Sequence, residues 1–598
     1  MAGPKNFWPG TRVTRPVVMR NKILVLQPCL QAVLLLLAVI ALYAGSLSAP
    51  FVFDDISFFE DTEALSKFGH SFFNFDLRWF SYASFGWTTN WSGLELFWLR
   101  LGNMLLHAAN AVALFFLLRR LFHVTLTDAE QVNAGKTDGT PLSSSTGLRT
   151  ELAWLAFFGA LIFALHPIAV YGVAYLVQRS ISMATLFVLL MLLAYLEGIL
   201  RACQKSGQKN TWRWMLTAAL CYFAAVYSKE HSIMAPGVAL ALTFLVRKPS
   251  AALFRQILPY YVLSALIALT VLLSAKGVLG EIYEPNAWGM FDRAAKMQGL
   301  LDLPNVHLLS ILTQSWFYFK YLGLWLLPNP AWMSADMREP FAMSLFSWPQ
   351  TLGFAAFLAY PCTAVWLLLK RGKMGLLGFA LLFPWILYLT ELSVVRVQEP
   401  FVLYRSYLWM PGLFAALPVL SLSKWPVLSG WLAPKRAFIL LGAICLLLAP
   451  LALNRISTFS SSLLLWDDAK KLVQNKPGAY GIERIYYNCG TELGQLKRYD
   501  EAIAHFTAAI AAYPGFDFIY GNRATAYYLQ GKYREALHDD NRAIALNPDN
   551  PNSYYNRALI YRALGDYAAA QEDLGKSCAL GLCFQNMPGN PEPSQSLF

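Results

Sequence analysis

Eleven runs of mostly apolar residues, each long enough to cross a lipid bilayer as a helix, recur along the first 455 residues of this chain of 598. A hydrocarbon core about 30 Å thick is crossed by roughly 20 apolar residues in a helix. Because lipid offers the backbone no hydrogen-bond partner, each run is predicted to fold as a transmembrane helix. The predicted spans are residues 23–47, 97–119, 152–168, 180–200, 213–228, 232–247, 257–275, 348–370, 374–394, 407–422 and 437–453.

The composition agrees with a polytopic membrane protein. Hydrophobic residues make up 56 % of the chain and charged residues only 14 %, which excludes an ordinary soluble protein. The net charge of +12 does not indicate nucleic-acid binding, because the basic residues lie mostly in short loops between apolar runs. In such loops basic residues set the orientation of the chain in the membrane.

The distribution of these basic residues predicts the topology. Arg12, Arg15, Arg20 and Lys22 precede the first span, so the N-terminus is predicted to lie in the cytoplasm. Counted from there, every predicted cytoplasmic loop carries Lys or Arg, and the opposite loops carry most of the acids. An odd number of spans places everything after about residue 455 outside the cytoplasm.

A further apolar run, residues 311–327, does not fit this count. Lys320 lies near its middle, and a Pro-Asn-Pro segment follows it. As a full span it would invert the later loops and put their basic residues outside. It is therefore predicted to be an interfacial or re-entrant helix on the non-cytoplasmic side.

The C-terminal part contains a repeat of 34 residues. Tyr499, Tyr533 and Tyr567 are spaced by this period, and so are Ala502, Ala536 and Ala570. The spacing and residue types are those of the tetratricopeptide repeat, in which two antiparallel helices meet at small alanines. Three such units are enough for a stable solenoid that binds extended peptides or protein surfaces. A spacer or a dimerisation module is the alternative.

These features divide the chain into three predicted parts. Residues 1–455 form the membrane domain, residues 456–480 a linker or first helix, and residues 481–598 about three repeats. Cys578 and Cys583 lie close together in the tail. They can form a disulfide if the tail is outside the cytosol, and the sequence leaves this open.

Ionisable and amide side chains within or beside the spans are costly, and are therefore functional candidates. By the predicted topology nearly all of them face one side of the membrane. They are Asp54 and Asp55 after the first span, Asn103 and His107 on one helix face, His166, Arg179, Lys229, Glu230, Glu399, Arg405 and Tyr407.

This grouping suits one chemistry. An acidic pair can remove a proton from an acceptor hydroxyl. Cations at the headgroup level can hold a phosphate whose tail lies in lipid. Each residue also has a plain structural alternative. The acids can be topology determinants, His107 a hydrogen-bonded packing residue, and Arg179 and Arg405 interfacial anchors.

The motifs, taken in order, resemble a known family. "FVFDD", "NMLLH", "HPIAVYGVAYLVQR", "SKEHSIMAP", "TQSWFYFKYLGLWLLP" and "YRSYLWMP" precede the repeats. Each motif alone is weak, but the ordered set resembles the transmembrane and tetratricopeptide-repeat-containing O-mannosyltransferases and their bacterial relatives, which are GT-C glycosyltransferases. The resemblance runs from about Phe51 to Leu580.

The resemblance implies an all-α, polytopic GT-C fold of about 11 spans in a bacterial inner membrane, followed by a periplasmic repeat solenoid. It implies an inverting transfer of a sugar from a polyprenyl-phosphate donor to Ser or Thr hydroxyls of an exported protein, such as a pilin. The repeats would help to bind this acceptor.

Site roles follow from the same resemblance. Asp54 or Asp55 would be the general base, and Asp55 is favoured. The other expected roles are donor or phosphate binding by Arg405, Lys229, Arg179, Glu230 and Tyr407, and pocket lining by His107, His166, Arg78, Asn103 and Glu399.

One departure concerns Tyr171, where the animal members carry a glutamate, so the donor sugar can differ from mannose. No acidic cluster demands a divalent ion, and metal dependence stays open. The family uses no cofactor beyond its lipid-linked donor. Two other functions compete: sugar transfer to a glycolipid or cell-wall polymer, and a non-enzymatic scaffold for an export or pilus machine.

Overall fold

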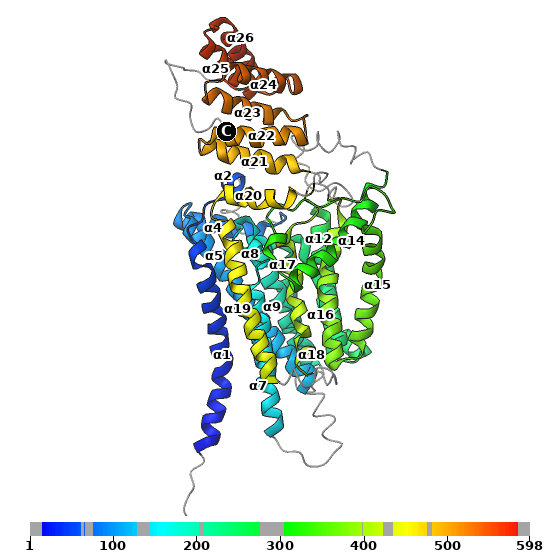
Figure 1. Cartoon of the computed structure of the whole chain (residues 1–598). Helices are drawn as coiled ribbons and strands as arrows, with labels where there is room; N and C mark the ends of the chain where they lie inside the picture. Colours follow the sequence, from blue (N-terminus) through cyan, green and yellow to red (C-terminus); the bar gives the residue numbers. More distant parts are fainter. Residues whose placement is uncertain are drawn as a thin grey trace, which may run out of the picture.

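The computed structural model describes residues 15–60, 65, 76–127, 143–202, 208–274, 304–396, 399–422, 434–474, 476 and 481–583. These residues form helices and connecting loops, and no strand occurs among them. One isolated antiparallel bridge joins Met337 to Phe401. A bundle of long helices carries the C-terminal repeats at one end (Figure 1). The predicted all-helical class is confirmed.

Eight described helical segments are long and apolar enough to cross a membrane. They coincide with eight of the eleven runs identified in the sequence. The helices that form them are α1 (Arg15–Tyr43), α5 (Leu96–Phe122), α7 (Ser143–Leu165), α9 (Arg179–Ala202), α12 (Ala251–Ser274), α15 (Gln350–Leu369), α16 (Gly372–Tyr388) and α19 (Pro434–Thr458).

The other three runs are not among these eight segments. Residues 213–228 lie in α10 (Gln208–Ser228), and residues 232–247 form the short α11 (Ala235–Val246) after a 3-10 turn, η4 (Glu230–Met234). The run 407–422 is broken into pieces, and Pro411 lies in the first turn of the 3-10 segment, where its missing N–H removes a helical hydrogen bond. The pieces are α17 (Ser406–Trp409), η9 (Met410–Ala416) and α18 (Leu417–Leu422). The count of eleven spans stays a prediction.

The run that did not fit the topology forms α14 (Val306–Leu326). Lys320 on this helix is paired with Glu339, with 2.6 Å between Nζ and Oε2. This ion pair accommodates a charge in the middle of an apolar helix. Its placement at a membrane interface stays a prediction.

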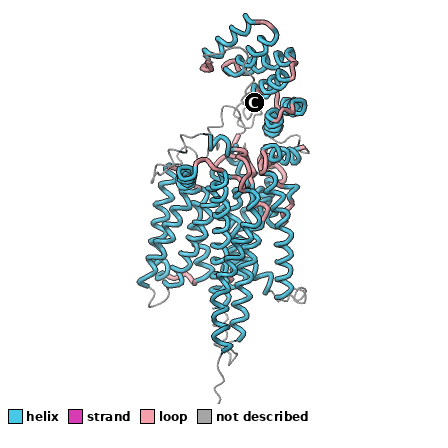
Figure 2. The backbone as a smooth tube through the Cα atoms, turned by 90° about the vertical axis from the view of Figure 1, so that its left-hand side faces the viewer, coloured by secondary structure: helices cyan, strands magenta, loops and turns pink. Residues whose placement is uncertain are grey.

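The repeats consist of paired helices that follow one another in an arc above the bundle (Figure 2). The alanines at the predicted helix contacts, Ala502, Ala536 and Ala570, are all buried. The pairs are α21 (Ile482–Gln495) with α22 (Tyr499–Ala512), α23 (Asp517–Leu529) with α24 (Tyr533–Leu546), and α25 (Pro551–Leu564) with α26 (Tyr567–Ala579).

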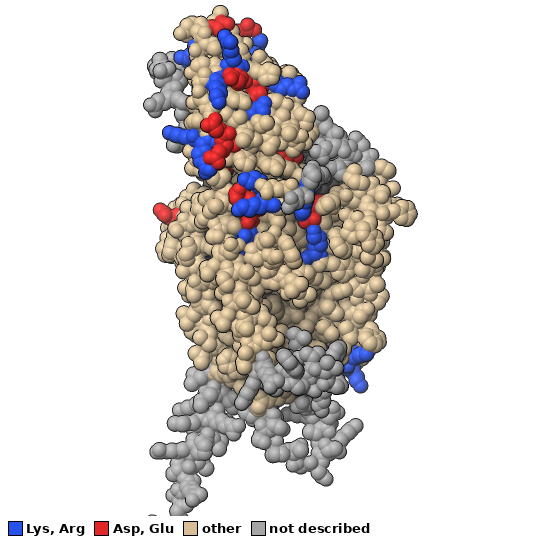
Figure 3. Space-filling model, viewed as in Figure 1, with Lys and Arg blue, Asp and Glu red and all other residues tan. Residues whose placement is uncertain are grey.

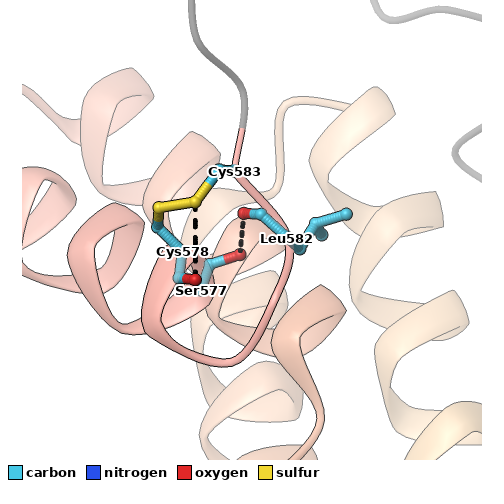
Figure 4. Close-up of a disulfide and its surroundings, with 4 residues drawn as sticks. All are labelled: Ser577, Cys578, Leu582 and Cys583. Carbon is cyan, nitrogen blue, oxygen red and sulfur yellow. Dashed lines mark hydrogen bonds between the residues drawn. A yellow bond between two sulfur atoms is a disulfide. The ribbon is translucent and has the colours of Figure 1, made fainter.

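A disulfide between Cys578 and Cys583 closes the end of α26 (Figure 4). Beside it, the Ser577 hydroxyl donates a hydrogen bond to the Leu582 carbonyl oxygen over 3.2 Å. The structure therefore contains the disulfide that the sequence left open.

The hydrophobic core of the bundle continues into the start of the repeats. Trp466 and Val473 of α20 (Ser462–Val473) and Ile485 of α21 belong to the same buried cluster as the bundle helices. Ion pairs reinforce this junction, among them Arg484 Nη1 with Glu399 Oε1 at 3.2 Å. The first repeat helix is thus packed as part of the bundle.

Charged side chains are distributed unevenly. On the face shown in Figure 3, Lys, Arg, Asp and Glu of the described residues gather on the repeats and at their junction with the bundle. The band of the bundle below the junction is covered by uncharged residues on this face. Such a band fits a surface in contact with lipid.

Candidate active site

At the end of the bundle that carries the repeats, Asp54 lines two neighbouring cavities. The cationic cavity has a volume of about 300 Å³, and its walls include Arg78, Lys229, Arg396 and Arg405. The junction cavity has a volume of about 470 Å³ and lies between α2 (Asp54–Glu60) and helices α20, α21 and α23. The structure therefore brings Asp54 together with cationic side chains, such as Lys229 and Arg405, from motifs that are far apart in the sequence.

Asp54 is the member of the acidic pair with access to both cavities. The chain turns into α2 through Phe53, whose left-handed backbone (φ 58°) sets the direction of the helix. Asp54 is solvent-exposed within the cavities although protein surrounds it. The Tyr175 hydroxyl donates a hydrogen bond of 2.6 Å to its Oδ2. Burial raises the pKa of Asp54, the charge of Glu399 raises it further, and Arg484 opposes both.

Asp55 is completely buried and lines neither cavity. Its carboxylate accepts hydrogen bonds from the backbone N–H groups of Leu176, at 3.3 Å, and Val177, at 2.9 Å. Burial raises the pKa of Asp55 to about 7, although the Val177 amide and Arg100 favour its charged form. Asp55 therefore fixes α2 to the turn η3 (Leu176–Gln178).

Lys229 provides the clearest anion-binding group of the cationic cavity. It is 4 % exposed, and its ammonium forms no hydrogen bond or ion pair with any described residue. Burial, together with the positive charge of Arg78, lowers the pKa of Lys229 to about 7. A buried ammonium without a partner is costly unless an anion binds to it. The neighbouring Glu230 does not fill this role, because Arg78 holds it in a bidentate pair at 2.6 and 3.1 Å.

Glu391 organises the other cations of the cavity. Its carboxylate lies 2.6 Å from Arg396 Nε, 3.3 Å from Arg405 Nη1 and 3.0 Å from His231 Nε2. Glu391 is 1 % exposed, so it is positioned behind the arginines. The sequence analysis did not select it, although an acid within an apolar run is a signal of function.

Several predicted site residues lie deeper in the bundle and line neither cavity. His107 Nδ1 is 2.6 Å from the Tyr407 hydroxyl, and His166 stacks on Trp325 at a centroid distance of 4.1 Å. Both histidines and Tyr407 are buried. Their contacts are those of packing residues. The expected roles, pocket lining for the two histidines and donor or phosphate binding for Tyr407, stay predictions.

Arg179 is also directed into the protein interior. Its Nε donates to Asn103 Oδ1 over 2.7 Å, and its Nη2 donates to the Leu99 carbonyl oxygen over 2.6 Å. Gly102 makes room for it, since a Cβ there would lie 2.9 Å from Nη2. Arg179 and Asn103 thus brace α5 against the start of α9, directly after the turn that Asp55 holds.

The described residues contain no group of three or more His, Cys, Asp or Glu side chains placed to hold a metal ion. Metal dependence therefore stays open, as the sequence left it.

This is a helical, membrane-type protein with a repeat solenoid at one end. An acidic residue lies between a cationic cavity and that solenoid. The repeats are confirmed independently, because residues 524–565 match the family described as TPR repeat, and residues 483–516 and 551–580 match the tetratricopeptide repeat.

One curated human protein, "Protein O-mannosyl-transferase TMTC2", is 29 % identical to this chain over 206 residues. The match covers 32 % of this chain and 23 % of the relative, so the chain spans less than a quarter of the relative's length. The name of this relative describes an O-mannosyltransferase that acts on protein. It agrees with the resemblance drawn from the motifs, and bears on neither a bacterial origin nor the side of the membrane.

Proposed function

We propose that this chain is a membrane glycosyltransferase of the GT-C type that transfers a sugar from a polyprenyl-phosphate donor to Ser or Thr hydroxyls of a protein acceptor. The observation that carries the proposal is the position of Asp54, which lines both the cationic cavity and the junction cavity. One carboxylate can therefore meet a phosphate-linked sugar from one side and an acceptor hydroxyl from the other.

The cationic cavity is assigned to the donor phosphate. Lys229 has no protein partner in the described chain, and Arg405 also lines the cavity. Two cations directed at one site suit a phosphodiester, which accepts charge-assisted hydrogen bonds. The cavity lies at the end of the apolar helices, so a polyprenyl tail can remain in the lipid while its phosphate binds.

The chemical step follows from this arrangement. Asp54 accepts the proton of the acceptor hydroxyl, and the oxygen attacks the anomeric carbon on the face opposite the phosphate. The bond between that carbon and the phosphate oxygen breaks, and its electron pair leaves on the polyprenyl phosphate. Lys229 and Arg405 stabilise the negative charge that develops there. Attack from the opposite face inverts the anomeric configuration.

The structure supports Asp54 as the base in preference to Asp55, which the sequence analysis favoured. A base needs hydrogen-bond reach to the acceptor, and Asp55 is 0 % exposed. Asp55 is assigned a positioning role instead, since it bonds to the backbone of η3.

The repeats favour a protein acceptor over a glycolipid or cell-wall polymer, because such solenoids bind polypeptides. Lys229, whose ammonium has no partner among the described residues, disfavours a pure scaffold, which has no use for a buried ammonium. A non-cytoplasmic position of the repeats is part of the proposal, and the basic loops of the sequence support it. The bacterial inner membrane is proposed from the resemblance of the motifs.

The test compares cells that express the wild-type chain with cells that express Asp54→Asn, by intact-mass proteomics of exported proteins. Asparagine keeps the shape of the side chain and removes the base, so transfer is expected to fall by about 100-fold or more. Asp549→Asn is the matched control, because this aspartate is exposed on a loop of the repeats.

A sugar-sized mass that disappears only with Asp54→Asn supports the proposal and identifies the acceptor. Full glycosylation with Asp54→Asn, at equal protein levels, excludes Asp54 as the base. A mass lost from lipid extracts instead of exported proteins assigns the activity to glycolipid acceptors.

A further inference from the structure

The junction cavity has a wall of large apolar side chains contributed by helices far apart in the sequence. Phe53 and Ile56 come from the region of α2, Trp466 from α20, and Phe516 and Ile519 from the start of α23. Phe53 stacks on Trp466 with ring centroids 5.1 Å apart. The guanidinium of Arg484 lies 4.9 Å from the centroid of Phe53. This wall is a preformed apolar site directly beside Asp54.

The polar side chains of the same cavity give it a negative character. Glu483 and Glu492 line it together with Asp54, so three carboxyl groups face the same space. The cation in the wall, Arg484, is already paired with Glu399 outside this cavity. One oxygen of Glu483 has no hydrogen-bond partner among the described residues. A negatively charged ligand group would therefore be disfavoured here, and a hydrogen-bond donor favoured.

Asn488 adds a group suited to a polypeptide backbone. It lines the cavity from α21, the first helix of the repeats. A side-chain amide offers both donors and an acceptor, which matches the N–H and C=O groups of a peptide. The cavity volume of about 470 Å³ accommodates a short extended segment with one large side chain.

Resting on the proposed function, we propose that the junction cavity is the acceptor subsite and selects a bulky apolar side chain within two residues of the acceptor Ser or Thr. With the hydroxyl at Asp54, an extended chain places its neighbours about 3.5 Å further per residue, among Ile56, Trp466 and Phe516. Acidic residues at the same position are excluded by Glu483 and Glu492.

The occupant is the acceptor and not the polyprenyl tail. The junction cavity is built from α2 and the repeat helices, whereas the tail requires contact with lipid. Asp54 is shared with the cationic cavity, so the donor phosphate is already placed on the other side.

The first experiment measures transfer by the purified full chain to peptides with one central Thr, using donor from membrane extracts. Each position from two before to two after the Thr carries Phe, Ala or Glu in turn. At one or two of these positions Phe is expected to exceed Ala by about tenfold or more in kcat/KM, the effect of burying one large apolar side chain. Glu is expected to be the poorest residue there.

The variant Ile56→Trp should remove this preference by filling the cavity. Ile56 is 39 % exposed, so a larger side chain is accommodated without disrupting the fold. KM for the Phe peptide is expected to rise about tenfold while kcat and the KM of the donor stay unchanged. Leu464→Trp is the matched control, because Leu464 is exposed on α20 and lines neither cavity.

The outcomes separate the two proposals. Transfer to peptides with no preference at any position overturns the subsite and leaves the glycosyltransferase intact. A rise in donor KM with Ile56→Trp, equal for all peptides, places the lipid tail in the junction cavity and also overturns the subsite. No transfer to any peptide or protein refutes the proposed function itself.

Binding can be tested without turnover. A peptide with benzoylphenylalanine beside the Thr is irradiated with the full Asp54→Asn chain. Crosslinks are expected on α2, α20 or α23 and not in the chain with Ile56→Trp added. Crosslinks confined to other helices overturn the subsite, whatever the activity assay gives.

Discussion

Replacement of Asp540 by leucine is expected to stabilise the repeats. Asp540 lies on α24 and is completely buried, and neither carboxylate oxygen has a hydrogen-bond partner among the described residues. The equivalent position one period earlier is Phe506, which is also completely buried. Asp540 therefore occupies a core position of the solenoid. Leucine has the same branched shape, so it fills the space without a new cavity.

The magnitude follows from the cost of the lone carboxyl group. A buried polar group without a partner costs about 1–3 kcal/mol, and leucine adds favourable apolar burial. Asp540→Leu is thus expected to raise the local free energy of unfolding by about 2 kcal/mol or more. The adjacent variant Asp539→Leu is a control, for which the local free energy of unfolding is expected to fall. Asp539 is equally buried but accepts two hydrogen bonds from Arg523, at 2.7 and 2.9 Å.

The same group predicts a pH dependence. Burial raises the pKa of Asp540 well above its usual value, and the charge of Asp539 adds to this. The folded repeats therefore hold a proton that the unfolded chain releases above about pH 4. Stability falls as pH rises from there toward the folded pKa, by at most about 1.4 kcal/mol per pH unit. The leucine variant should lack this slope.

Hydrogen exchange of the full chain in detergent, read by mass spectrometry over α24 and α26, measures these local free energies directly. Slower exchange in Asp540→Leu and faster exchange in Asp539→Leu are expected at pH 7. Faster exchange in Asp540→Leu would refute the reasoning, since it would mean that the carboxylate has a stabilising partner.

Two further predictions concern the cationic cavity. Because the pKa of Lys229 is lowered to about 7, its ammonium loses its proton as the pH rises. The donor KM of the wild type should therefore increase above pH 7, whereas that of Lys229→Arg should stay constant. Steady-state kinetics across pH check this. Glu391→Gln leaves Arg396, Arg405 and His231 without their shared anion and should destabilise the bundle by about 3 kcal/mol. The variant is expected to aggregate at a lower temperature than the wild type when heated in detergent. An unchanged aggregation temperature would show that other groups stabilise the arginines.

The main architecture could be predicted from the sequence because two periodic signals are strong. Apolar runs of spanning length located eight helices that the structure contains, and the 34-residue period located the repeats. The run at 407–422 has the same average character, but it is broken near Pro411. Averaged hydrophobicity hides such a break, and proline alone does not signal it, because α12, α15 and α16 continue through Pro259, Pro361 and Pro384.

The site could be predicted only as a group of residues. The cost of burying charge singled out Lys229, Arg405 and the acidic pair, and the family resemblance added Arg78; the structure places all of them at one end of the bundle. Sequence does not show which of two adjacent acids faces a cavity, because that depends on the backbone amides of η3. The junction cavity was also beyond reach, since it needs contact between Phe53 and Trp466.

Arg179 illustrates a second limit. A conspicuous arginine beside a span suggested phosphate binding, yet its guanidinium is satisfied by Asn103 and by the Leu99 carbonyl oxygen. Sequence alone does not distinguish an arginine that braces helices from one that binds a ligand, because both need burial and hydrogen bonds.

The shared core of the bundle and the first repeat has a consequence for which polypeptides can be modified. Since α20 and α21 share the core of the bundle, the junction cavity that they form with Asp54 stays at one height relative to the predicted spans. Under the proposed function, a hydroxyl must be brought down to that height. Stalks and unstructured tails that can be drawn to the membrane surface qualify, and sites on the far side of a rigid domain do not. The protein would therefore select acceptors by how close their hydroxyl groups can come to the membrane surface, as well as by their sequence.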